Sequence, residues 1–279
     1  MRSLDLPSDL EASIFDVCVR GLRNEDLGSR LESISQEVRD AATRYLERGR
    51  SDTLHHFVEH AAVGTVTKDE MVDLYNKRFA KGPGRGVYDE IKSLSKNGVC
   101  PYCDHGTVRT LDHVLSKSKF PSLSVVPLNL VGCCADCNKL KPNIAPSSLS
   151  ETPLHPYFDN IDDCQWLFAS VSIGPVPSII FRAEYVGHWS VELNERVQNH
   201  FEYMELGNLY SRQAAREMSN KRQMIVEIRR SGGANEVADR LREEFHSSRA
   251  VRVNSWRTAL YEALSQNAWF CDVGHAFEG

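Results

Sequence analysis

The sequence predicts an α+β fold, in which a mostly helical shell surrounds a small element of two strands and one helix. Apolar residues recur about every 3.6 positions over much of both flanks, as in amphipathic helices. Near the centre, a short alternating stretch lies between two Cys-x-x-Cys pairs. The 279 residues are enough for one or two domains, and no internal repeat or low-complexity segment interrupts them.

The N-terminal region, residues 1–64, is predicted to consist of helices. One apolar stripe runs over residues 10–22, where Ser8 or Asp9 supplies the N-cap, and a second stripe runs over residues 31–46. This region carries no pattern of reactive side chains, so its sequence indicates structure rather than chemistry.

Residues 65–99 form a predicted helical lead-in to the central element. A capping box at residues 67–70 starts one helix, which the run KGPGRG at 81–86 must break. A short helix is then expected over residues 88–95, and Asn97-Gly98 closes it with a left-handed cap just before the first cysteine.

The C-terminal region, residues 161–279, is predicted to contain a strand and long helices. It follows a stretch rich in Pro and Ser, residues 142–156, which should be irregular. Residues 176–186 are β-branched and bounded by Pro and Gly, as expected of a strand. The pattern over residues 191–265 is helical, with a break at the sequence SGGAN, 231–235. We expect this region to dock on a partner protein.

Composition indicates a soluble, cytoplasmic protein. No apolar run approaches the ~18 residues that span a bilayer, and the acidic start of the chain is unlike a secretory signal. The net charge of −5 is not that of a protein that coats nucleic acid. However, residues 91–142 hold seven Lys or Arg against three Asp, which gives this window a charge of +4. Such a basic patch suits contact with phosphates at one site, although ordinary solvated lysines would produce the same count.

The two cysteine pairs predict a structural zinc site. A two-residue gap lets one tight turn present two thiolates to a tetrahedral ion, and four thiolates leave no position open for a reacting water. The remaining cysteines are scattered, which argues against a disulfide framework. Cys133 adjoins a predicted ligand and is interpreted as a buried thiol rather than as a competing one. The predicted zinc ligands are Cys100, Cys103, Cys134 and Cys137.

The segment between the cysteine pairs is predicted to fold as strand, loop, strand and helix. Residues 107–111 alternate like a strand that delivers Asp112-His113 at its end, and residues 124–127 return as the second strand. Asn129 follows that strand, and a short helix opened by the second cysteine pair carries Asn138. Zinc would tie the base of the hairpin to this helix.

These residues resemble the HNH endonuclease superfamily, the ββα-metal nucleases, in the branch that contains zinc knuckles. The spacings of 16 residues from His113 to Asn129 and 9 from Asn129 to Asn138 agree with that family. The wider string also resembles a group of stand-alone bacterial HNH proteins, and the likeness covers residues 71–170. It rests on the segments VYDEI, CPYC, LDHVLSKSKFP, PLNLV, CADCNKLK, LHPYFD and QWLF.

The resemblance implies a role for each residue of the motif. His113 would be the general base that accepts a proton from the attacking water. Asp112 and Asn138 would hold one catalytic Mg²⁺ or Mn²⁺, because hard oxygen ligands favour these ions. Asn129 would brace the loop and orient His113. Taken singly, each of these residues is more often structural than catalytic, and only their spacing inside the zinc clasp favours catalysis.

Further residues are assigned less directly. We expect Lys117, Lys119, Lys139 and Lys141 to contact phosphates, with simple solvation as the alternative. His155 recurs in the resembling group, where it would cap or pack the site. The expected substrate is nucleic acid, DNA rather than RNA, hydrolysed to a 5′-phosphate and a 3′-hydroxyl.

The resemblance also suggests a biological setting. Stand-alone proteins of this kind resemble nuclease components of bacterial antiviral defence systems, such as the Septu type, which pairs a nuclease with an ATPase subunit. The chain has no recognisable DNA-reading helix, so a partner would supply the targeting. The alternative function is a non-catalytic, zinc-stabilised module that binds nucleic acid or another protein.

Overall fold

The computed structural model describes residues 1–7, 13–174 and 176–273, which separate into two compact units. Unit 1 comprises Met1–Asn160 and unit 2 comprises Ile161–Gly279. Each unit combines helices with short antiparallel strands, so the predicted α+β fold is confirmed. The predicted N-cap at Ser8 or Asp9 lies outside the described residues.

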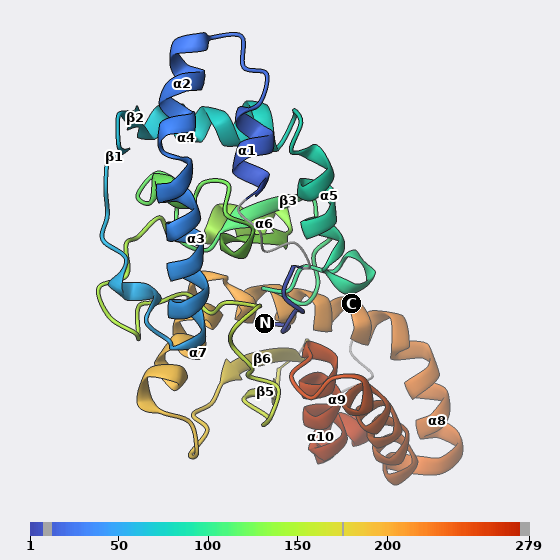
Figure 1. The fold of residues 1–279 in the computed structure, drawn as a ribbon. Coiled ribbons are helices and arrows are strands. Elements are labelled where there is room, and N and C mark those ends of the chain that lie inside the picture. Colours follow the sequence, from blue (N-terminus) through green and yellow to red (C-terminus); the bar gives the residue numbers. More distant parts are fainter. Residues whose placement is uncertain (8–12, 175, 274–279) are drawn as a thin grey trace. The chain divides into compact units, whose positions relative to one another are not determined.

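Unit 1 begins with three helices, α1 (Ser13–Val19), α2 (Glu25–Ser33) and α3 (Ser35–Arg50), which confirm the predicted helical N-terminal region (Figure 1). The predicted stripe over residues 31–46 is divided by Ile34, which separates α2 from α3. The short helix η1 (Leu54–His56) and the small hairpin of β1 (Ala62–Val63) and β2 (Val66–Thr67) follow.

The lead-in helices follow their local sequence signals closely. The capping box of Thr67 and Glu70 starts α4 (Lys68–Asp73), which continues as the π-helix η2 (Leu74–Phe79). The glycine-rich run ends it, and α5 (Arg85–Ser93) begins within that run. The short helix η3 (Lys96–Gly98) then ends in left-handed backbone, with φ of 57° at Asn97 and 65° at Gly98, as predicted.

The central element consists of β3 (Thr110–His113), β4 (Leu130–Cys133) and α6 (Ala135–Leu140). The two strands are antiparallel, and His113 pairs with Leu130. In Figure 1, α3 and α5 stand on either side of this element.

Two of the predicted strand positions are wrong. The first strand starts later than residue 107 and includes Asp112 and His113 rather than ending before them. Residues 124–127 form no strand; they lie between and within two 3₁₀ turns, η4 (Pro121–Leu123) and η5 (Pro127–Asn129). Each turn begins with a proline, which has no N–H to donate to a strand ladder.

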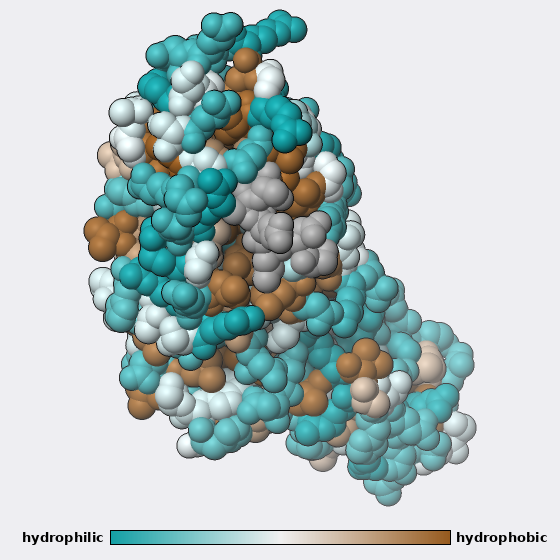
Figure 2. All heavy atoms as spheres, viewed as in Figure 1, coloured by the Kyte–Doolittle hydropathy of each residue, from teal (hydrophilic) through white to brown (hydrophobic). Residues whose placement is uncertain are grey.

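The core of unit 1 joins the N-terminal helices to the loop of the central element. Its largest fully buried side chains include Phe15, Tyr45, Phe79 and Phe120, which come from four separate segments. Hydrophilic residues cover much of the surface in Figure 2, as expected when the apolar faces of the helices point inward.

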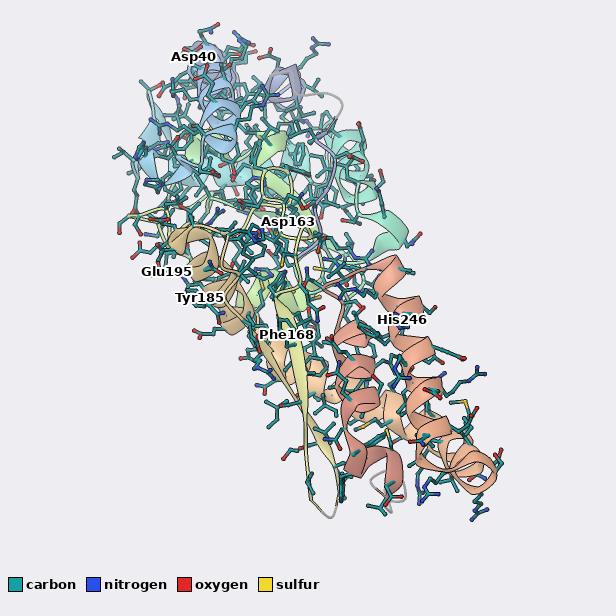
Figure 3. All side chains as sticks on the ribbon, turned by 90° about the horizontal axis from the view of Figure 1, so that it is seen from below. Asp40, Asp163, Phe168, Tyr185, Glu195 and His246 are labelled. Atoms are coloured by element: carbon teal, nitrogen blue, oxygen red, sulfur yellow. The ribbon has the colours of Figure 1, made fainter. Side chains whose placement is uncertain are left out.

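Unit 2 contains the hairpin of β5 (Leu167–Ser172) and β6 (Ser178–Ala183), followed by helices. The strand predicted over residues 176–186 corresponds to β6, whereas β5 was not predicted. Figure 3 shows the hairpin as a long ribbon, with Phe168 labelled on β5. Asn254 holds the segment that leads into β5, because its Oδ1 accepts from Trp166 N at 2.8 Å and its Nδ2 donates to Cys164 O at 2.8 Å.

The helices of unit 2 are α7 (Val191–Tyr203), α8 (Leu206–Val251), α9 (Trp256–Gln266) and α10 (Ala268–Asp272). The predicted interruption of the helical region is present inside α8, where Gly233 adopts a φ of 81° that only glycine adopts readily. Within the described residues, no helix combines the length and apolar character that a membrane crossing requires.

Candidate zinc centre and active site

Four buried cysteines converge at one end of the central element. The Sγ atoms of Cys100, Cys103, Cys134 and Cys137 all lie within 4.8 Å of one another. Those of Cys103 and Cys134 are 3.9 Å apart, close to the ~3.8 Å edge of a tetrahedron with ~2.3 Å Zn–S bonds. The cluster therefore fits the structural zinc ion that the sequence predicts.

Backbone N–H groups also converge on this cluster. Gly106 N donates to Cys103 Sγ at 3.3 Å, and Cys137 N donates to Cys134 Sγ at 3.4 Å, where Cys134 is the N-cap of α6. Hydrogen bonds from the other three thiols lower the pKa of Cys134, with a smaller contribution from this backbone N–H. These donors favour the thiolate form of Cys134, which is the form that binds zinc.

A substitution at Gly106 should disrupt the cysteine cluster. A Cβ atom there would lie 2.7 Å from Cys134 Cβ and 2.8 Å from Cys134 Sγ, so Cys134 or the turn that contains Gly106 would have to move. We expect Gly106→Ala to lower the free energy of unfolding by about 1–3 kcal/mol and to weaken zinc retention against a chelator. Gly28→Ala is the control, because no atom lies within 4 Å of its Cβ position. Equal zinc retention in the two variants would contradict the expectation.

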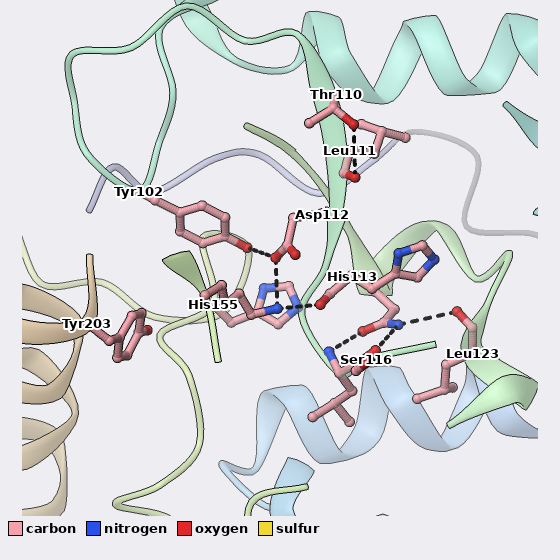
Figure 4. Close-up of polar contacts among 12 residues, drawn as sticks. Tyr102, Thr110, Leu111, Asp112, His113, Ser116, Leu123, His155 and Tyr203 are labelled. Atoms are coloured by element: carbon pink, nitrogen blue, oxygen red, sulfur yellow. Dashed lines mark hydrogen bonds and ion pairs between the residues drawn. The ribbon is translucent and has the colours of Figure 1, made fainter. Parts of the chain in front are cut away.

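Asp112 lies on β3 and is buried between two donors (Figure 4). Its Oδ2 accepts from Tyr102 Oη at 2.9 Å and from Lys141 Nζ at 2.8 Å. Lys141 also donates to the backbone oxygen of His113. Among the described residues Oδ1 of Asp112 has no hydrogen bond, so one oxygen of this carboxylate remains available to a ligand.

His113 is held in one tautomer. Its Nε2 lies 2.9 Å from Ser124 O, and because a carbonyl only accepts, Nε2 must carry the proton. Within the part of the chain that the structure describes, Nδ1 has no partner and is left as an acceptor. Burial, reinforced by the nearby Lys117 ammonium, holds the pKa of His113 well below its usual value. The imidazole is therefore neutral near pH 7, as a proton acceptor must be.

Asn129 is fully buried behind this histidine. Its Oδ1 accepts from Leu115 N at 2.7 Å, and its Nδ2 donates to Leu115 O at 2.8 Å and to Leu123 O at 3.3 Å. It joins the two ends of the loop that leads from His113 to Ser124. Asn129 acts on the loop rather than on a ligand, since it does not line the neighbouring cavity.

Asp112, His113 and Asn138 line one cavity of about 650 Å³, open on one side. Asn138 reaches it from α6 and is exposed. The charged residues of the cavity wall are three lysines and the single carboxylate of Asp112, so the wall favours an anion. Most of the remaining wall is polar or aromatic. The full lining is Tyr75, Asn76, Ala80, Lys81, Tyr88, Thr110, Leu111, Asp112, His113, Ser116, Lys117, Ser118, Asn138, Lys141, Pro142 and Asn143.

The four lysines of the sequence prediction differ in position. Lys117 and Lys141 line the cavity, and Lys117 Nζ also lies 4.2 Å from the centre of the Tyr75 ring. Lys119 instead pairs with Glu59 at 3.1 Å, and Lys139 is exposed outside the cavity lining. Sequence reasoning missed Lys81, because its glycine-rich run was interpreted only as a helix break.

Tyr102 was missed as well, although its position between two cysteine ligands was a usable signal. The turn that presents the two thiolates also directs its hydroxyl to Asp112. The zinc centre and the acidic residue of the cavity are thereby coupled through a single side chain.

The oxygen donors present suit a divalent cation. Asp112 offers a carboxylate oxygen and Asn138 an amide oxygen on the same cavity, and hard oxygen donors of this kind match Mg²⁺ or Mn²⁺. Such ions commonly complete their shell with water and substrate phosphate, so two protein ligands are sufficient.

Comparison with known proteins gives one similarity of note. The chain is 29% identical over 224 residues to "Protein ea31" of Escherichia phage lambda, which covers 75% of this chain and 75% of that protein. No family model matches the chain. No solved structure matches it either.

Proposed function

We propose that the chain is a metal-dependent endonuclease of the HNH type, which hydrolyses phosphodiester bonds in nucleic acid, preferentially DNA. The observation that carries the proposal is the shared cavity of Asp112, His113 and Asn138. A neutral imidazole with a free acceptor, a carboxylate and lysines meet there, and these groups supply a base and positive charge that can promote phosphodiester hydrolysis.

His113 would act as the general base. Ser124 O fixes its proton on Nε2, so Nδ1 would accept a proton from a water that attacks phosphorus. The bond from phosphorus to the 3′ oxygen would break, and that oxygen would leave with a proton from solvent. The products would carry a 5′-phosphate and a 3′-hydroxyl.

The other residues of the cavity would bind and orient the phosphate. Lys117 and Lys141 would bind its anionic oxygens, and Tyr102 would hold Asp112 in place. Asp112 and Asn138 would hold Mg²⁺ or Mn²⁺, which when bound supplies positive charge that stabilises the developing negative charge. None of these roles depends on the 2′-hydroxyl that distinguishes RNA from DNA, so RNA is the second substrate to test.

The proposal also covers the protein partner and the biological role. Because the sequence has no recognisable DNA-reading helix, we propose that a protein partner supplies targeting. An ATPase subunit in a cytoplasmic antiviral defence system fits this need, with unit 2 as the docking region.

Cleavage assays test this proposal. Supercoiled plasmid and total tRNA should be incubated with the pure protein in Mg²⁺ or Mn²⁺, beside His113→Ala. We expect cleavage by the wild type and a loss of at least about 100-fold in the variant. His188→Ala is the matched control, because His188 is an exposed histidine of unit 2 that pairs with Asp163 at 3.0 Å.

The outcomes separate the alternatives. Cutting that survives in His113→Ala would point to a contaminating nuclease and count against the proposal. Absence of cutting with both substrates, and again after addition of a candidate ATPase partner, would favour the non-catalytic binding module. Zinc content and circular dichroism should match between the variants in every case.

A further inference from the structure

A tyrosine from the N-terminal helices reaches the loop of the candidate active site. Tyr45 lies on α3 and is completely buried, and its hydroxyl donates to Asn129 Oδ1 at 3.0 Å. The two residues are 84 positions apart in sequence. The contact therefore joins the N-terminal helical region to the central element, although the two regions are far apart in the sequence.

His155 fixes the direction of this hydrogen bond. Its Nδ1 accepts from Tyr157 N at 3.2 Å, so the ring proton must be on Nε2. Nε2 lies 3.1 Å from Leu128 O and 3.1 Å from Tyr45 Oη, and it can donate to both. The Tyr45 hydroxyl, which accepts from His155, is then oriented to donate to Asn129.

Asn129 connects Tyr45 to the loop that orients the catalytic histidine. It holds Leu115 and Leu123 together, and Leu123 is the neighbour of Ser124, whose carbonyl accepts the proton of His113 Nε2. A continuous chain of hydrogen bonds thus runs from His155 to the loop that sets the tautomer of His113. Each link is buried, where an unmade hydrogen bond is costly.

A second contact from the N-terminal region clamps the same loop. His60 Nε2 accepts from Ser122 N at 3.3 Å, and His60 N donates to Lys119 O at 3.1 Å. The other ring nitrogen lies 3.1 Å from Val58 O and carries the proton in this arrangement. The loop is therefore held from the N-terminal region at two independent points.

We infer that Tyr45 and His155 are positioning residues, which hold this loop so that Ser124 keeps His113 in its proton-accepting tautomer. The kinetic part of this inference rests on the proposed function, whereas the part that concerns the order of the loop does not. A purely structural hydrogen bond would affect stability but would leave the loop and the turnover of bound substrate unchanged.

The test compares Tyr45→Phe with the wild type. This change keeps the buried ring and removes only the hydroxyl, so Asn129 Oδ1 loses one of its two donors. We expect faster hydrogen exchange of the Leu115 amide and of residues 114–124, with zinc content unchanged. We further expect kcat to fall about tenfold with KM within about twofold, because the variant disturbs the base rather than substrate binding.

Tyr261→Phe is the matched control. It also removes one tyrosine hydroxyl, which donates to Glu217 at 2.6 Å within unit 2. It should leave both kcat and exchange of the loop unchanged. If Tyr45→Phe folds poorly, His155→Gln provides the second test, since its amide retains an N–H donor and should produce a smaller effect of the same kind.

Exchange and kinetics together decide the inference. Unchanged exchange of residues 114–124 in Tyr45→Phe would overturn it, whether or not the protein cleaves nucleic acid. Faster exchange with an unchanged kcat in a cleaving enzyme would also overturn it. If the wild type cleaves nothing but the loop loosens, the positioning contact stands and the proposed function fails.

Discussion

Removal of zinc should unfold the central element of unit 1 and leave unit 2 folded. The strands β3 and β4 have four residues each and α6 has six. Elements of this length are not stable by themselves in water. A zinc ion held by the four thiolates would connect them, and loss of a structural zinc removes folding free energy directly. We expect the free energy of unfolding of unit 1 to fall by on the order of 5 kcal/mol.

Three measurements test this prediction. Elemental analysis should give one zinc per chain, and Cys137→Ser should lose it. Hydrogen exchange after chelation should increase over residues 100–140 and stay unchanged over α8 and α9. Calorimetry should show a lower melting temperature for the transition of unit 1 alone.

Cys133→Ser is the control for this prediction. Cys133 is buried next to the ligand Cys134, but it is not part of the cysteine cluster, and it lies in β4 opposite Thr110. The variant should keep its zinc at a small cost in stability. Loss of zinc from Cys133→Ser with retention by Cys137→Ser would show that the ligand set is wrong.

Local signals in the sequence predicted several features of the fold correctly. The capping box at Thr67, the left-handed pair Asn97-Gly98 and the break at Gly233 each depend on neighbouring residues only, and all three are present. Such signals act through backbone conformation and local hydrogen bonds, so no knowledge of tertiary packing is needed.

The loop of the central element could not be predicted in the same way. Ser124–Pro127 is an apolar run that resembles a strand, yet it is buried on all sides and carries no alternation of exposed and buried residues. It packs against α3, and Asn129, which binds Leu123 O beside it, is itself held by Tyr45 from 84 positions away in sequence. The contacts from α3 are therefore distant in sequence. Of the four motif residues, Asp112, His113 and Asn138 line the cavity and Asn129 does not. Tyr45 carried no local signal of its contact with Asn129.

Removal of the ion pair between Lys141 and Asp112 should strongly lower the stability of unit 1. The two atoms are 2.8 Å apart, and both side chains are less than 10% exposed, at 6% and 8%. Removing one member of a buried ion pair typically costs about 3–5 kcal/mol, because the other charge is left uncompensated. We therefore expect Lys141→Met, which keeps the length and apolar stem of the side chain, to be strongly destabilised in buffer that lacks divalent ions.

Mn²⁺ should restore part of that stability, because a cation near Asp112 replaces the lost positive charge. An ion present at 100 times its Kd stabilises the folded state by about 2.7 kcal/mol. The Lys141→Met variant should also bind Mn²⁺ more tightly than the wild type, in which the ammonium group competes for the same carboxylate. Thermal unfolding across a Mn²⁺ titration, together with calorimetric binding in the absence of nucleic acid, measures both effects.

Lys119→Met provides the matched comparison for this last prediction. Lys119 also forms an ion pair, but its side chain is 26% exposed and that of its partner Glu59 is 53% exposed. An exposed pair contributes about 1 kcal/mol or less, so this variant should be nearly as stable as the wild type and should respond to Mn²⁺ in the same way as the wild type. Equal responses to Mn²⁺ in Lys141→Met and Lys119→Met would mean that the ion does not share Asp112 with Lys141. The selective response of Lys141→Met would instead identify Asp112 as the carboxylate for which ammonium and metal compete, independently of any cleavage assay.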